Sequence, residues 1–351
     1  MNYSRTVQVL SKYKSSTLTQ VALNCGFPTE GTKQNKIDLI YNGLKLYNVT
    51  GDNIDILSID IGIKNFAYCK SKLDFSNIKL ENWQNNKLEN WQNNKLENWQ
   101  NNQLENWQNN QLEIWQNINL ENWQNINLNE KFKYNQLSNI IDEKNHLSYL
   151  SNCIINQIIM IPPFPKIITI ENQRTRSNGL TATLPTVLTN YTLENMLYSS
   201  IYTNKLYNEK FNPLVIPLNS RNMVNFWINR FLKKSNIKFN SLLTKKLRIN
   251  LVLHLLTNNI IKLDIDLKDL SIVDKKPNYL LKLINAHSSN KISKIDDLVD
   301  CLLYNYMMIQ FLQNQSSLAN VIQHDLDLDS FVNNLNDKYF EYAKNLNLQM
   351  K

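Results

Sequence analysis

Short apolar segments with strand character alternate along the 351-residue chain with longer segments of helical character, and this alternation limits the fold most. Residues 54–60 (IDILSID) and 65–70 (NFAYCK) are predicted strands joined around Gly62, and 166–174 (KIITIENQR) contains another buried strand. Helices are expected at 136–160 and in the segments TLENMLYSSIY, TKKLRINLVLHLL and DDLVDCLLYNYMMIQFLQ. This order of strands and helices predicts an α/β domain.

The N-terminal part of the chain has a different pattern, which predicts a small helical module. Apolar residues recur at helical spacing over residues 6–24, a break begins at Gly26, and Thr32 is a candidate cap for a second short helix, KIDLIYNGL. A unit of this size encloses little core, so we expect it to lean on the larger domain. No acidic residue precedes Glu30, which is typical of an organelle-targeting segment and equally of a basic DNA-binding helix.

An octapeptide, LENWQNNK, repeats from Leu80 to about Leu128 and contains every tryptophan except Trp227. Within each copy, Leu and Trp lie three residues apart, which suits neither a helical stripe nor one face of a strand. We interpret the block as a tandem expansion of one strand or loop element, because long surface insertions cost little loop entropy. The alternative is an aromatic ladder that stacks single-stranded bases or mediates self-association. The glutamate in each unit disfavours contact with phosphates.

Composition restricts the partners and the chemistry. Lysine and arginine outnumber aspartate and glutamate by 38 to 30, and the net charge of +8 favours a polyanionic partner such as nucleic acid. No apolar run is long enough to predict a membrane span. The 4 cysteines lie far apart without a C-x-x-C pair, which disfavours zinc sites and disulfides. Neither a P-loop nor a G-x-G-x-x-G motif is present, so no nucleotide cofactor is expected.

Acidic residues stand in three places that structure alone does not favour. Asp60 lies among the apolar residues of the first strand, and Glu171 ends the strand KIITIE. Asp296, Asp297 and Asp300 open the apolar helix DDLVDCLL. Asp300 therefore shares a helical face with Asp297 at i, i+3 and with Asp296 at i, i+4. A carboxylate flanked by buried isoleucines has a high desolvation cost unless a cation or a hydrogen-bond donor compensates it.

Each of these positions also has a purely structural interpretation. Asp296 and Asp297 are favourable at a helix N-terminus, where they offset the positive end of the helix dipole. Glu171 is compatible with a surface position at a strand end. Asp60 and Asp300 are harder to explain in this way, because apolar residues flank both.

Together the acids predict an all-oxygen site for hard cations, Mg²⁺ or Mn²⁺. Two such ions in one site would activate a water and stabilise the leaving oxygen at a phosphodiester.

Six segments occur in an order that points to a known family. They are LSIDIGIKNFAYC, IITIENQRTRS, TLENMLY, NFW, TKKLRINLV and DDLVDCLLY. In this order they resemble the fungal mitochondrial Holliday-junction resolvases, which are relatives of RuvC in the ribonuclease-H-like superfamily. The segment LNCGFPTEGTKQNKIDLI is similar to the SAP-like DNA-binding element at the N-terminus of that family. The resemblance covers most of the chain except the repeat block and the tail.

The resemblance implies a ribonuclease-H-like fold with a mixed five-stranded sheet flanked by helices. It also implies a homodimer in mitochondria that nicks four-way DNA junctions in pairs with Mg²⁺ as cofactor. On this basis the chain divides into a SAP-like module at 1–50, a resolvase domain at 51–320 and a polar C-terminal tail at 321–351, helical at most. The octapeptide block forms an insertion at 79–129 in the resolvase domain, where a short β-hairpin arm is expected.

Carried over position by position, the resemblance assigns the first-strand metal ligand to Asp60 and the acid of the later strand to Glu171. The acidic pair of the last helix falls on Asp300 with either Asp297 or Asp296. The D-x-x-D spacing favours Asp297. We expect Asp60 to bridge two metals while the other acids complete their shells.

Four basic residues are candidate contacts to DNA. Lys64, Arg174 and Arg176 stand close in sequence to the acids, and Lys33 belongs to the SAP-like element. Each is also compatible with an ordinary solvated charge. Asn172 follows Glu171 where the family leads us to expect a basic residue.

These assignments predict in-line attack by a metal-bound water that leaves 5′-phosphate and 3′-hydroxyl ends. Two rival functions stay open at this point. One is a ribonuclease of the same fold that acts on RNA–DNA hybrids. The other is a non-catalytic junction- or DNA-binding protein of an organelle nucleoid, which has no use for the full acidic set.

Overall fold

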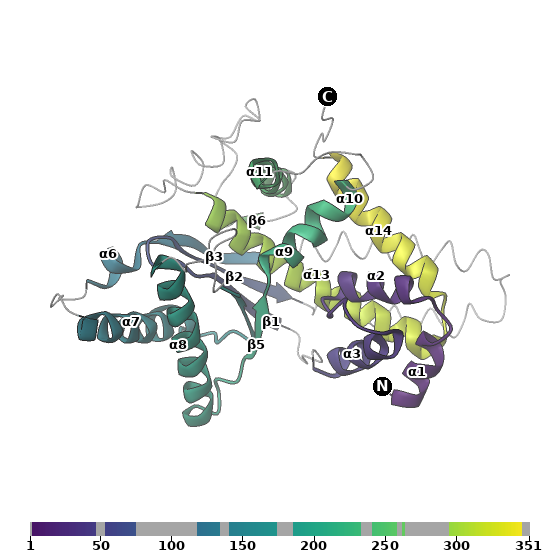
Figure 1. The fold of residues 1–351 in the computed structure, drawn as a ribbon, viewed down its shortest axis with the longest axis horizontal. Coiled ribbons are helices and arrows are strands. Elements are labelled where there is room, and N and C mark those ends of the chain that lie inside the picture. The colour runs from purple at the N-terminus through teal and green to yellow at the C-terminus, as the bar shows by residue number, and fades with distance from the viewer. Residues whose placement is uncertain are drawn as a thin grey trace.

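The computed structural model describes residues 2–46, 53–74, 118–133, 140–173, 185–232, 241–257, 262–263 and 295–345. Strands and helices alternate as the sequence predicts (Figure 1). The strands are β1 (Asn53–Asp60), β2 (Phe66–Asp74), β3 (Ile118–Ile126), β4 (Ile167–Glu171), β5 (Leu214–Leu218) and β6 (Lys262–Leu263). The helices before β5 are α1 (Tyr3–Leu10), α2 (Ser15–Cys25), α3 (Lys33–Leu46), α6 (Leu128–Phe132), α7 (Ile140–Ile154), the π-helix η1 (Ile155–Ile159) and α8 (Pro185–Tyr207). Those after it are α9 (Ser220–Val224), the π-helix η2 (Asn225–Asn229), α10 (Arg230–Leu232), α11 (Ser241–Thr257), α13 (Asp296–His324) and α14 (Leu328–Asn345).

The strands form one mixed sheet in the order β5-β4-β1-β2-β3-β6. β1, β2 and β3 are antiparallel neighbours, whereas β4 and β5 run parallel to β1. The five expected strands are thus present as β1 to β5. The two-residue strand β6 adds a sixth by pairing in parallel with β3.

The alternation of side chains along the strands divides the core into two layers. Ile56 of β1 and Ile167 of β4 belong to the layer that contains α11, α13 and the N-terminal helices. Leu57 and Ile59 point to the other layer, which contains α7, η1 and α8. Figure 1 shows α7 and α8 on one side of the sheet, away from the N-terminal helices. We call the face that packs against α13 the α13 face of the sheet.

Helix α13 is fixed to the sheet by buried polar contacts as well as by apolar ones. The Asn305 side-chain amide donates to the carbonyl oxygens of Ile56 and Cys69, at 3.2 Å each. Ser71 Oγ donates to Asn305 Oδ1 at 2.6 Å, and Cys301 Sγ donates to the Ser58 carbonyl at 3.0 Å. These hydrogen bonds to backbone atoms of the central strands fix the position of α13 along the sheet.

Strand β3 belongs to the end of the octapeptide block, so this part of the expected insertion is a strand of the sheet. The rest of the expected insertion, up to residue 117, lies outside the described residues. A register shift opposite Lys70 and Ser71 marks a β-bulge at Glu121. The extra residue turns Leu120 and Trp123 to the same face, and both pack in the α13 layer. Our prediction that they lie on opposite faces was wrong for this copy, because it assumed a regular strand.

The N-terminal residues form three helices, where the sequence pattern predicted two. The segment expected as one helix at 6–24 is divided into α1 and α2 by a turn at residues 11–14. Thr32 caps α3 as proposed, since its Oγ1 accepts the backbone N–H of Asn35 at 3.3 Å. Helices α1 and α2 pack on α13, α2 also packs on α14, and α3 packs on α1 and α2, so the module leans on the larger domain.

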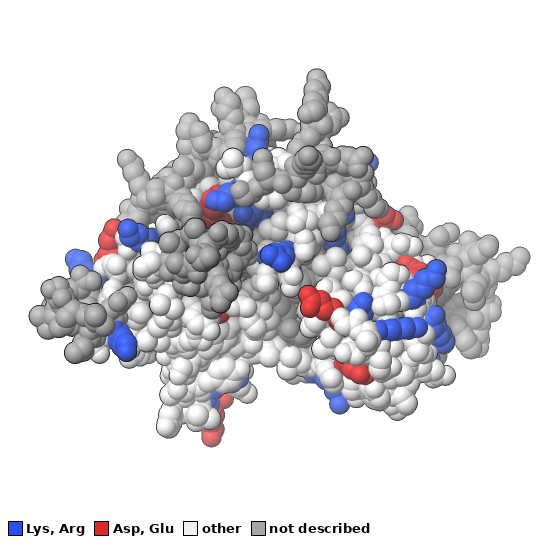
Figure 2. Space-filling model, in the orientation of Figure 1, with Lys and Arg blue, Asp and Glu red and all other residues white. Residues whose placement is uncertain are grey.

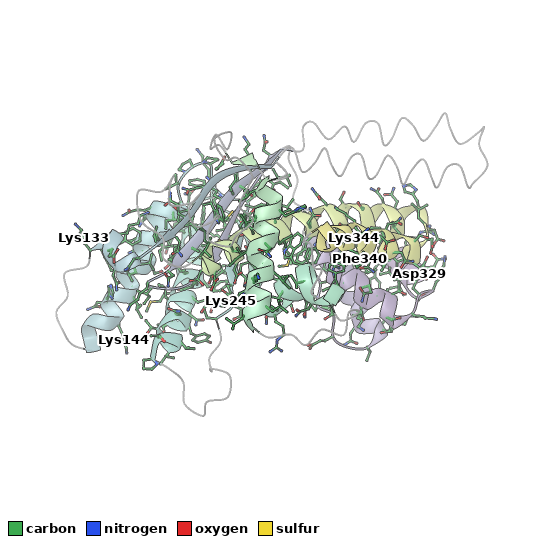
Figure 3. The ribbon with its side chains drawn as sticks, turned by 90° about the horizontal axis from the view of Figure 1, so that it is seen from above. Lys133, Lys144, Lys245, Asp329, Phe340 and Lys344 are labelled. Carbon is green, nitrogen blue, oxygen red and sulfur yellow. The ribbon has the colours of Figure 1, made fainter. Side chains whose placement is uncertain are left out.

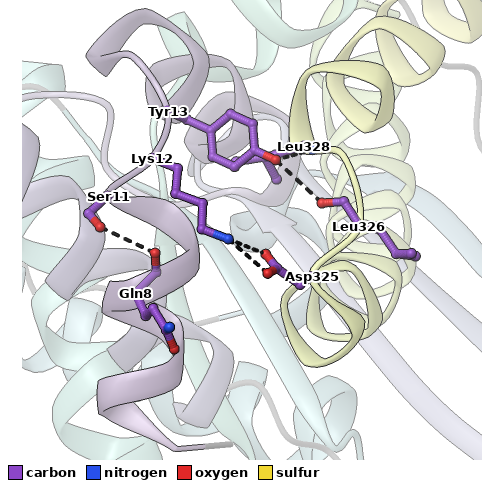
Figure 4. A network of polar contacts seen from close by, with 7 residues as sticks. All are labelled: Gln8, Ser11, Lys12, Tyr13, Asp325, Leu326 and Leu328. Atoms are coloured by element: carbon purple, nitrogen blue, oxygen red, sulfur yellow. Dashed lines mark hydrogen bonds and ion pairs between the residues drawn. The ribbon is translucent and has the colours of Figure 1, made fainter.

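Polar contacts tie the turn between α1 and α2 to the start of the C-terminal segment (Figure 4). Lys12 Nζ contacts the Asp325 carboxylate at 2.8 Å, and the Tyr13 hydroxyl accepts the Leu328 backbone N–H at 3.0 Å. The segment expected as a polar tail then continues as α14, which buries Leu335 and Tyr339. None of the helices in the described parts of the chain has the length and apolar character that a membrane crossing requires.

Candidate active site

The register of β1 and β4 brings the two strand acids together. The parallel pairing runs from Ile56 beside Ile167 to Ile59 beside Ile170, so Asp60 and Glu171 are the next neighbours. Asp60 and Glu171 each follow by two residues a side chain on the α13 face. Alternate residues of a strand share a face, so both acids lie on the α13 face as well. A hydrogen bond of 2.7 Å from Thr169 Oγ1 to Ser58 Oγ joins the preceding pair on that face.

Helix α13 brings its first acids to the same place. Cys301 and Asn305 hold the first three turns of α13 against β1, as described above. Asp297 and Asp300 are therefore close enough to Asp60 to act on its protonation. The structure thus gathers Asp60, Glu171, Asp297 and Asp300 at the ends of β1 and β4. We call these four side chains the acidic cluster.

Two members of the acidic cluster, Asp60 and Asp300, have raised pKa values. Asp60 is only 7% exposed, and burial raises its pKa well above the ordinary value. The charge of Glu171, a hydrogen bond with Glu171, and the charges of Asp297 and Asp300 raise the pKa of Asp60 further. Burial also raises the pKa of Asp300 to about 7, although the Arg248 guanidinium opposes this. Carboxylates so close together and so dry cannot all be ionised without added positive charge.

Helix α11 supplies positive charge next to this site. Arg248 forms an ion pair with Asp300 Oδ2, in which the side chains are 10% and 15% exposed. Lys245 pairs with Asp296 at 2.7 Å in a more exposed position. Figure 3 shows Lys245 between the α7 side of the molecule, marked by Lys144, and the α14 side.

The two candidates for the second helical acid therefore have different surroundings. Asp296 is engaged with Lys245, while Asp297 acts on the protonation of both Asp60 and Asp300. The geometry favours Asp297 as the partner of Asp300.

Three further residues belong to the site and were not singled out from the sequence. Arg248 is one of them. Glu194 of α8 is buried and accepts the Gln173 backbone N–H at 2.9 Å, next to the end of β4. Burial raises the pKa of Glu194, and the charge of Glu171 adds to the shift. Tyr304, one helical turn after Asp300, is buried, and its phenol pKa is raised by burial and then by Glu171, Asp300 and Asp60.

The segments TLENMLY and TKKLRINLV contain Glu194 and Arg248, but their spacing alone reads as ordinary helix. Only the partner of each residue, far away in sequence, indicates its role.

The candidate DNA-binding residues are more scattered. Lys64 is exposed in the turn that follows β1, at the same strand end as Asp60. Lys33 lies in the N-terminal module, and its ammonium donates to the Ser11 carbonyl at 2.6 Å. Arg174 and Arg176 lie outside the described residues. Figure 2 shows basic side chains gathered over the N-terminal helices, with a few acidic ones among them.

Asn172 donates its backbone N–H to the Leu218 carbonyl at 2.8 Å, and this contact continues the β4–β5 pairing past Glu171.

The chemistry of the acidic cluster fits a divalent cation. Its donors are all carboxylate oxygens, which Mg²⁺ and Mn²⁺ prefer. Asp300 Oδ1 is buried without a hydrogen-bond partner in the structure. As the side chains stand, no group of three or more acidic, histidine or cysteine residues in the described ranges is already arranged around one ion position. A cation bound here would offset the negative charge around Asp60 and could be reached by Asp300 Oδ1.

Comparison with known proteins agrees with this geometry. Among solved structures, the crystal structure of the yeast mitochondrial Holliday junction resolvase Ydc2 is similar, with a TM-score of 0.53 and 20% sequence identity. The similarity covers 89% of this chain and 99% of that one, and it confirms the expected ribonuclease-H-like fold. Characterised proteins compared by sequence gave no match. The family described as mitochondrial resolvase Ydc2 / RNA splicing MRS1 matches residues 56–318. Since that match covers well over half of the chain, the protein belongs to the mitochondrial resolvase Ydc2 / RNA splicing MRS1 family.

Proposed function

We propose that the protein is a structure-selective endonuclease that resolves four-way DNA junctions. The observation that carries this proposal is the convergence of Asp60, Glu171, Asp297 and Asp300 from two parallel strands and one helix. A buried cluster of carboxylates is unfavourable for stability and therefore points to a function. Binding divalent cations beside a phosphodiester is such a function. Membership of the resolvase family supports the same conclusion.

In this proposal the protein residues bind the cations, hold the site in position and neutralise charge. The four acids would hold Mg²⁺ or Mn²⁺, which would supply an activated water and stabilise charge on the leaving oxygen. Asp60, between Glu171 and the α13 acids, is best placed to contact more than one ion. Glu194 holds the backbone beyond Glu171 through Gln173 and so fixes the exit of β4.

Binding of the junction needs contacts that locate the phosphate backbone rather than a base sequence. Lys64 is exposed at the strand end that carries Asp60, and we propose that it contacts a phosphate near the cut. The N-terminal module, with Lys33, is proposed to hold a DNA arm. A homodimer suits this activity, because a four-way junction offers two symmetric strands to a twofold enzyme. The family name supports a mitochondrial location.

The family name also includes RNA splicing, so an RNA-binding protein is the second candidate. Such a protein, like a non-catalytic nucleoid protein, needs a basic surface but no acidic cluster. The retention of four converging carboxylates favours the nuclease. A ribonuclease that cuts RNA–DNA hybrids has the same needs as a resolvase, and only the substrate separates these two.

The proposal predicts that Asp60→Asn abolishes junction cleavage. The wild type is expected to place symmetric nicks in a synthetic four-way junction with Mg²⁺, and the variant is expected to be at least about 100-fold slower, because the charge that holds the cation is lost. The matched control is Asp55→Asn, since Asp55 is also buried in β1 but lies outside the acidic cluster. Gel analysis of end-labelled strands gives both rates.

Cleavage at the wild-type rate by Asp60→Asn would remove the acidic cluster from the reaction. Faster cutting of an RNA–DNA hybrid than of the junction would identify a ribonuclease. Binding of junction or RNA without any metal-dependent cleavage would favour the non-catalytic candidates.

A further inference from the structure

Helix α11 meets the acidic end of α13 through two ion pairs that differ in burial. Lys245 and Asp296 are 43% and 21% exposed, as expected for a surface pair of little energetic value. Arg248 and Asp300 are 10% and 15% exposed. Dry ion pairs of this kind add little stability over apolar residues of the same size. The buried pair therefore needs another explanation than stability.

The two oxygens of Asp300 have different surroundings. Oδ2 is taken by the Arg248 guanidinium. Oδ1 is buried and has no hydrogen-bond partner in the structure. The next residue of α13, Cys301, donates its Sγ to the Ser58 carbonyl of β1 at 3.0 Å, so Asp300 lies against the end of the strand that carries Asp60 and belongs to the cluster as well as to the ion pair. One oxygen is thus fixed by the protein while the other is left for a ligand.

We propose that Arg248 is a positioning residue for the metal site. This inference rests on the proposed nuclease function. Arg248 holds Asp300 by Oδ2, so that the carboxylate is fixed in one orientation and offers Oδ1 alone to a divalent cation. Arg248 touches neither the cation nor DNA and acts only through Asp300.

The chemistry of arginine suits this role better than that of lysine. A guanidinium is planar and stays charged when buried, whereas a buried ammonium loses its proton readily. Among the described residues, Arg248 Nε has no hydrogen-bond partner, so the contact that holds this side chain is its pair with Asp300. Partners that hold a metal ligand typically change metal affinity by about 10–100-fold when removed.

The test compares the Mn²⁺ requirement of Arg248→Met with that of Lys245→Met. Both variants remove one cation of α11 that pairs with an acid of α13. Two readouts are needed. One is Mn²⁺ binding without DNA, followed by the electron paramagnetic resonance of free Mn²⁺, and the other is the Mn²⁺ concentration for half-maximal junction cleavage. Circular dichroism first shows that each variant is folded.

We expect Arg248→Met to need at least about tenfold more Mn²⁺ in both readouts, with most of the cleavage rate restored at saturating Mn²⁺. Lys245→Met is expected to change either value by less than about twofold, because its pair is exposed. Arg248→Lys keeps a basic group that can pair with Asp300 but lacks the planar fork and loses its proton more readily, so it should be intermediate. In an Asp300→Asn background, Arg248→Met should have no further effect, because Arg248 acts through Asp300.

Three results would overturn the inference. They are an unchanged or lower Mn²⁺ requirement in folded Arg248→Met, an equal effect of Lys245→Met, and an undiminished effect in the Asp300→Asn background. If Arg248→Met does not fold, Arg248→Lys decides alone, and a wild-type Mn²⁺ requirement then counts against the proposal. Mn²⁺ binding without any cleavage by the wild type would contradict the nuclease function instead and leave the binding comparison valid.

Discussion

Asp60 is an acidic residue buried in a strand whose neighbouring side chains are apolar. Its neighbours Ile59 and Ile61 are buried, and Asp60 itself is nearly so. Glu171, Asp297 and Asp300 add negative charge to that position. In the absence of a cation, the folded protein reduces the repulsion by keeping protons, and this links stability to pH.

The metal-free protein is predicted to lose stability as pH rises. The folded-state pKa of Asp300 is raised from 3.8 to about 7, and that of Asp60 is raised as well, so the folded state binds more protons than the unfolded chain. The stabilisation is complete below about pH 4, where the unfolded carboxyl also keeps its proton, and is lost by about pH 7. Urea unfolding with EDTA across this range measures the slope.

The Asp300→Asn variant is the control for this pH dependence. It cannot lose that proton, so its stability should fall less steeply over the same range. Added Mn²⁺ should restore the wild type at neutral pH and have little effect at low pH, where the acids are protonated. A slope that is equal in the wild type and the variant would contradict the assignment.

Among single residues, some members of the site could be predicted from the sequence and others could not. Asp60 and Asp300 were recognisable because each interrupts an apolar pattern, which is a local signal. Arg248 interrupts nothing, because basic residues are common on helix surfaces. Its burial follows from the packing of α11 on α13, and helix packing cannot be read from local spacing. Glu194 was missed for the same reason.

Strand β3 shows how one irregularity changes the interpretation of a whole element. The bulge at Glu121 brings Leu120 and Trp123 to one face, although three-residue spacing in a regular strand separates them. Trp123 then reaches α13, where its indole N–H donates to the Leu298 carbonyl at 2.8 Å. Leu298 lies between Asp297 and Asp300, so β3 helps to hold the first turn of α13.

Substitution of Trp123 by Phe is predicted to affect both stability and the site. The lost hydrogen bond should cost about 1 kcal/mol in unfolding free energy, and the Mn²⁺ requirement for cleavage should rise, because the first turn of α13 is less firmly held. Trp227→Phe is the matched control. Trp227 makes the same kind of bond to the Leu303 carbonyl, further along α13.

The control variant should show a similar loss in urea unfolding with an unchanged Mn²⁺ requirement. If the two variants behave alike in cleavage, the contact of β3 with α13 has no special role at the site.

Element boundaries were the part of the fold that local pattern predicted least well. Residues 6–24 were expected as one helix, yet α1 ends at Leu10 and α2 begins at Ser15, within the gap between the apolar positions Leu10 and Leu18. The turn between them is held by tertiary contacts, such as that of Tyr13 with Leu328. The strand and helix order, in contrast, depends on periodicity along each segment and was predictable.

In the whole molecule, α13 joins the two halves that the sequence suggested. Its first turns carry the acids, and its C-terminal half receives the N-terminal module through buried amides. Asn314 Nδ2 donates to the Asn24 carbonyl at 2.6 Å, and Gln315 Nε2 donates to the Cys25 carbonyl at 2.7 Å. Gly26 ends α2 in this contact with φ of 74°, close against Phe311. The module is thus docked on the larger domain and not merely linked to it.

Substitution of Gly26 by Ala is predicted to disturb this docking. A Cβ there would lie 2.3 Å from the Phe311 ring, and the left-handed backbone adds strain, so the unfolding free energy should fall by about 2–4 kcal/mol. Gly31→Ala is the control. Gly31 also has positive φ, at 98°, but a Cβ there meets only the Asn35 side chain at 3.2 Å.

The unfolding free energy of Gly31→Ala should fall by about 1–2 kcal/mol, which is the cost of the left-handed backbone alone. Urea denaturation measures both variants. Equal losses would show that contact with Phe311 does not matter for docking.

A continuous helix between two functional ends also defines a length. Asp300 and Asn314 are separated along α13 by about 21 Å, given the rise of 1.5 Å per residue. Stacked base pairs advance about 3.4 Å each, so this length corresponds to about six of them. On the proposed function, a DNA arm gripped by the module is presented to the carboxylates at a constant offset from the grip. The length of α13 would then set how far from the module's grip the strand is cut.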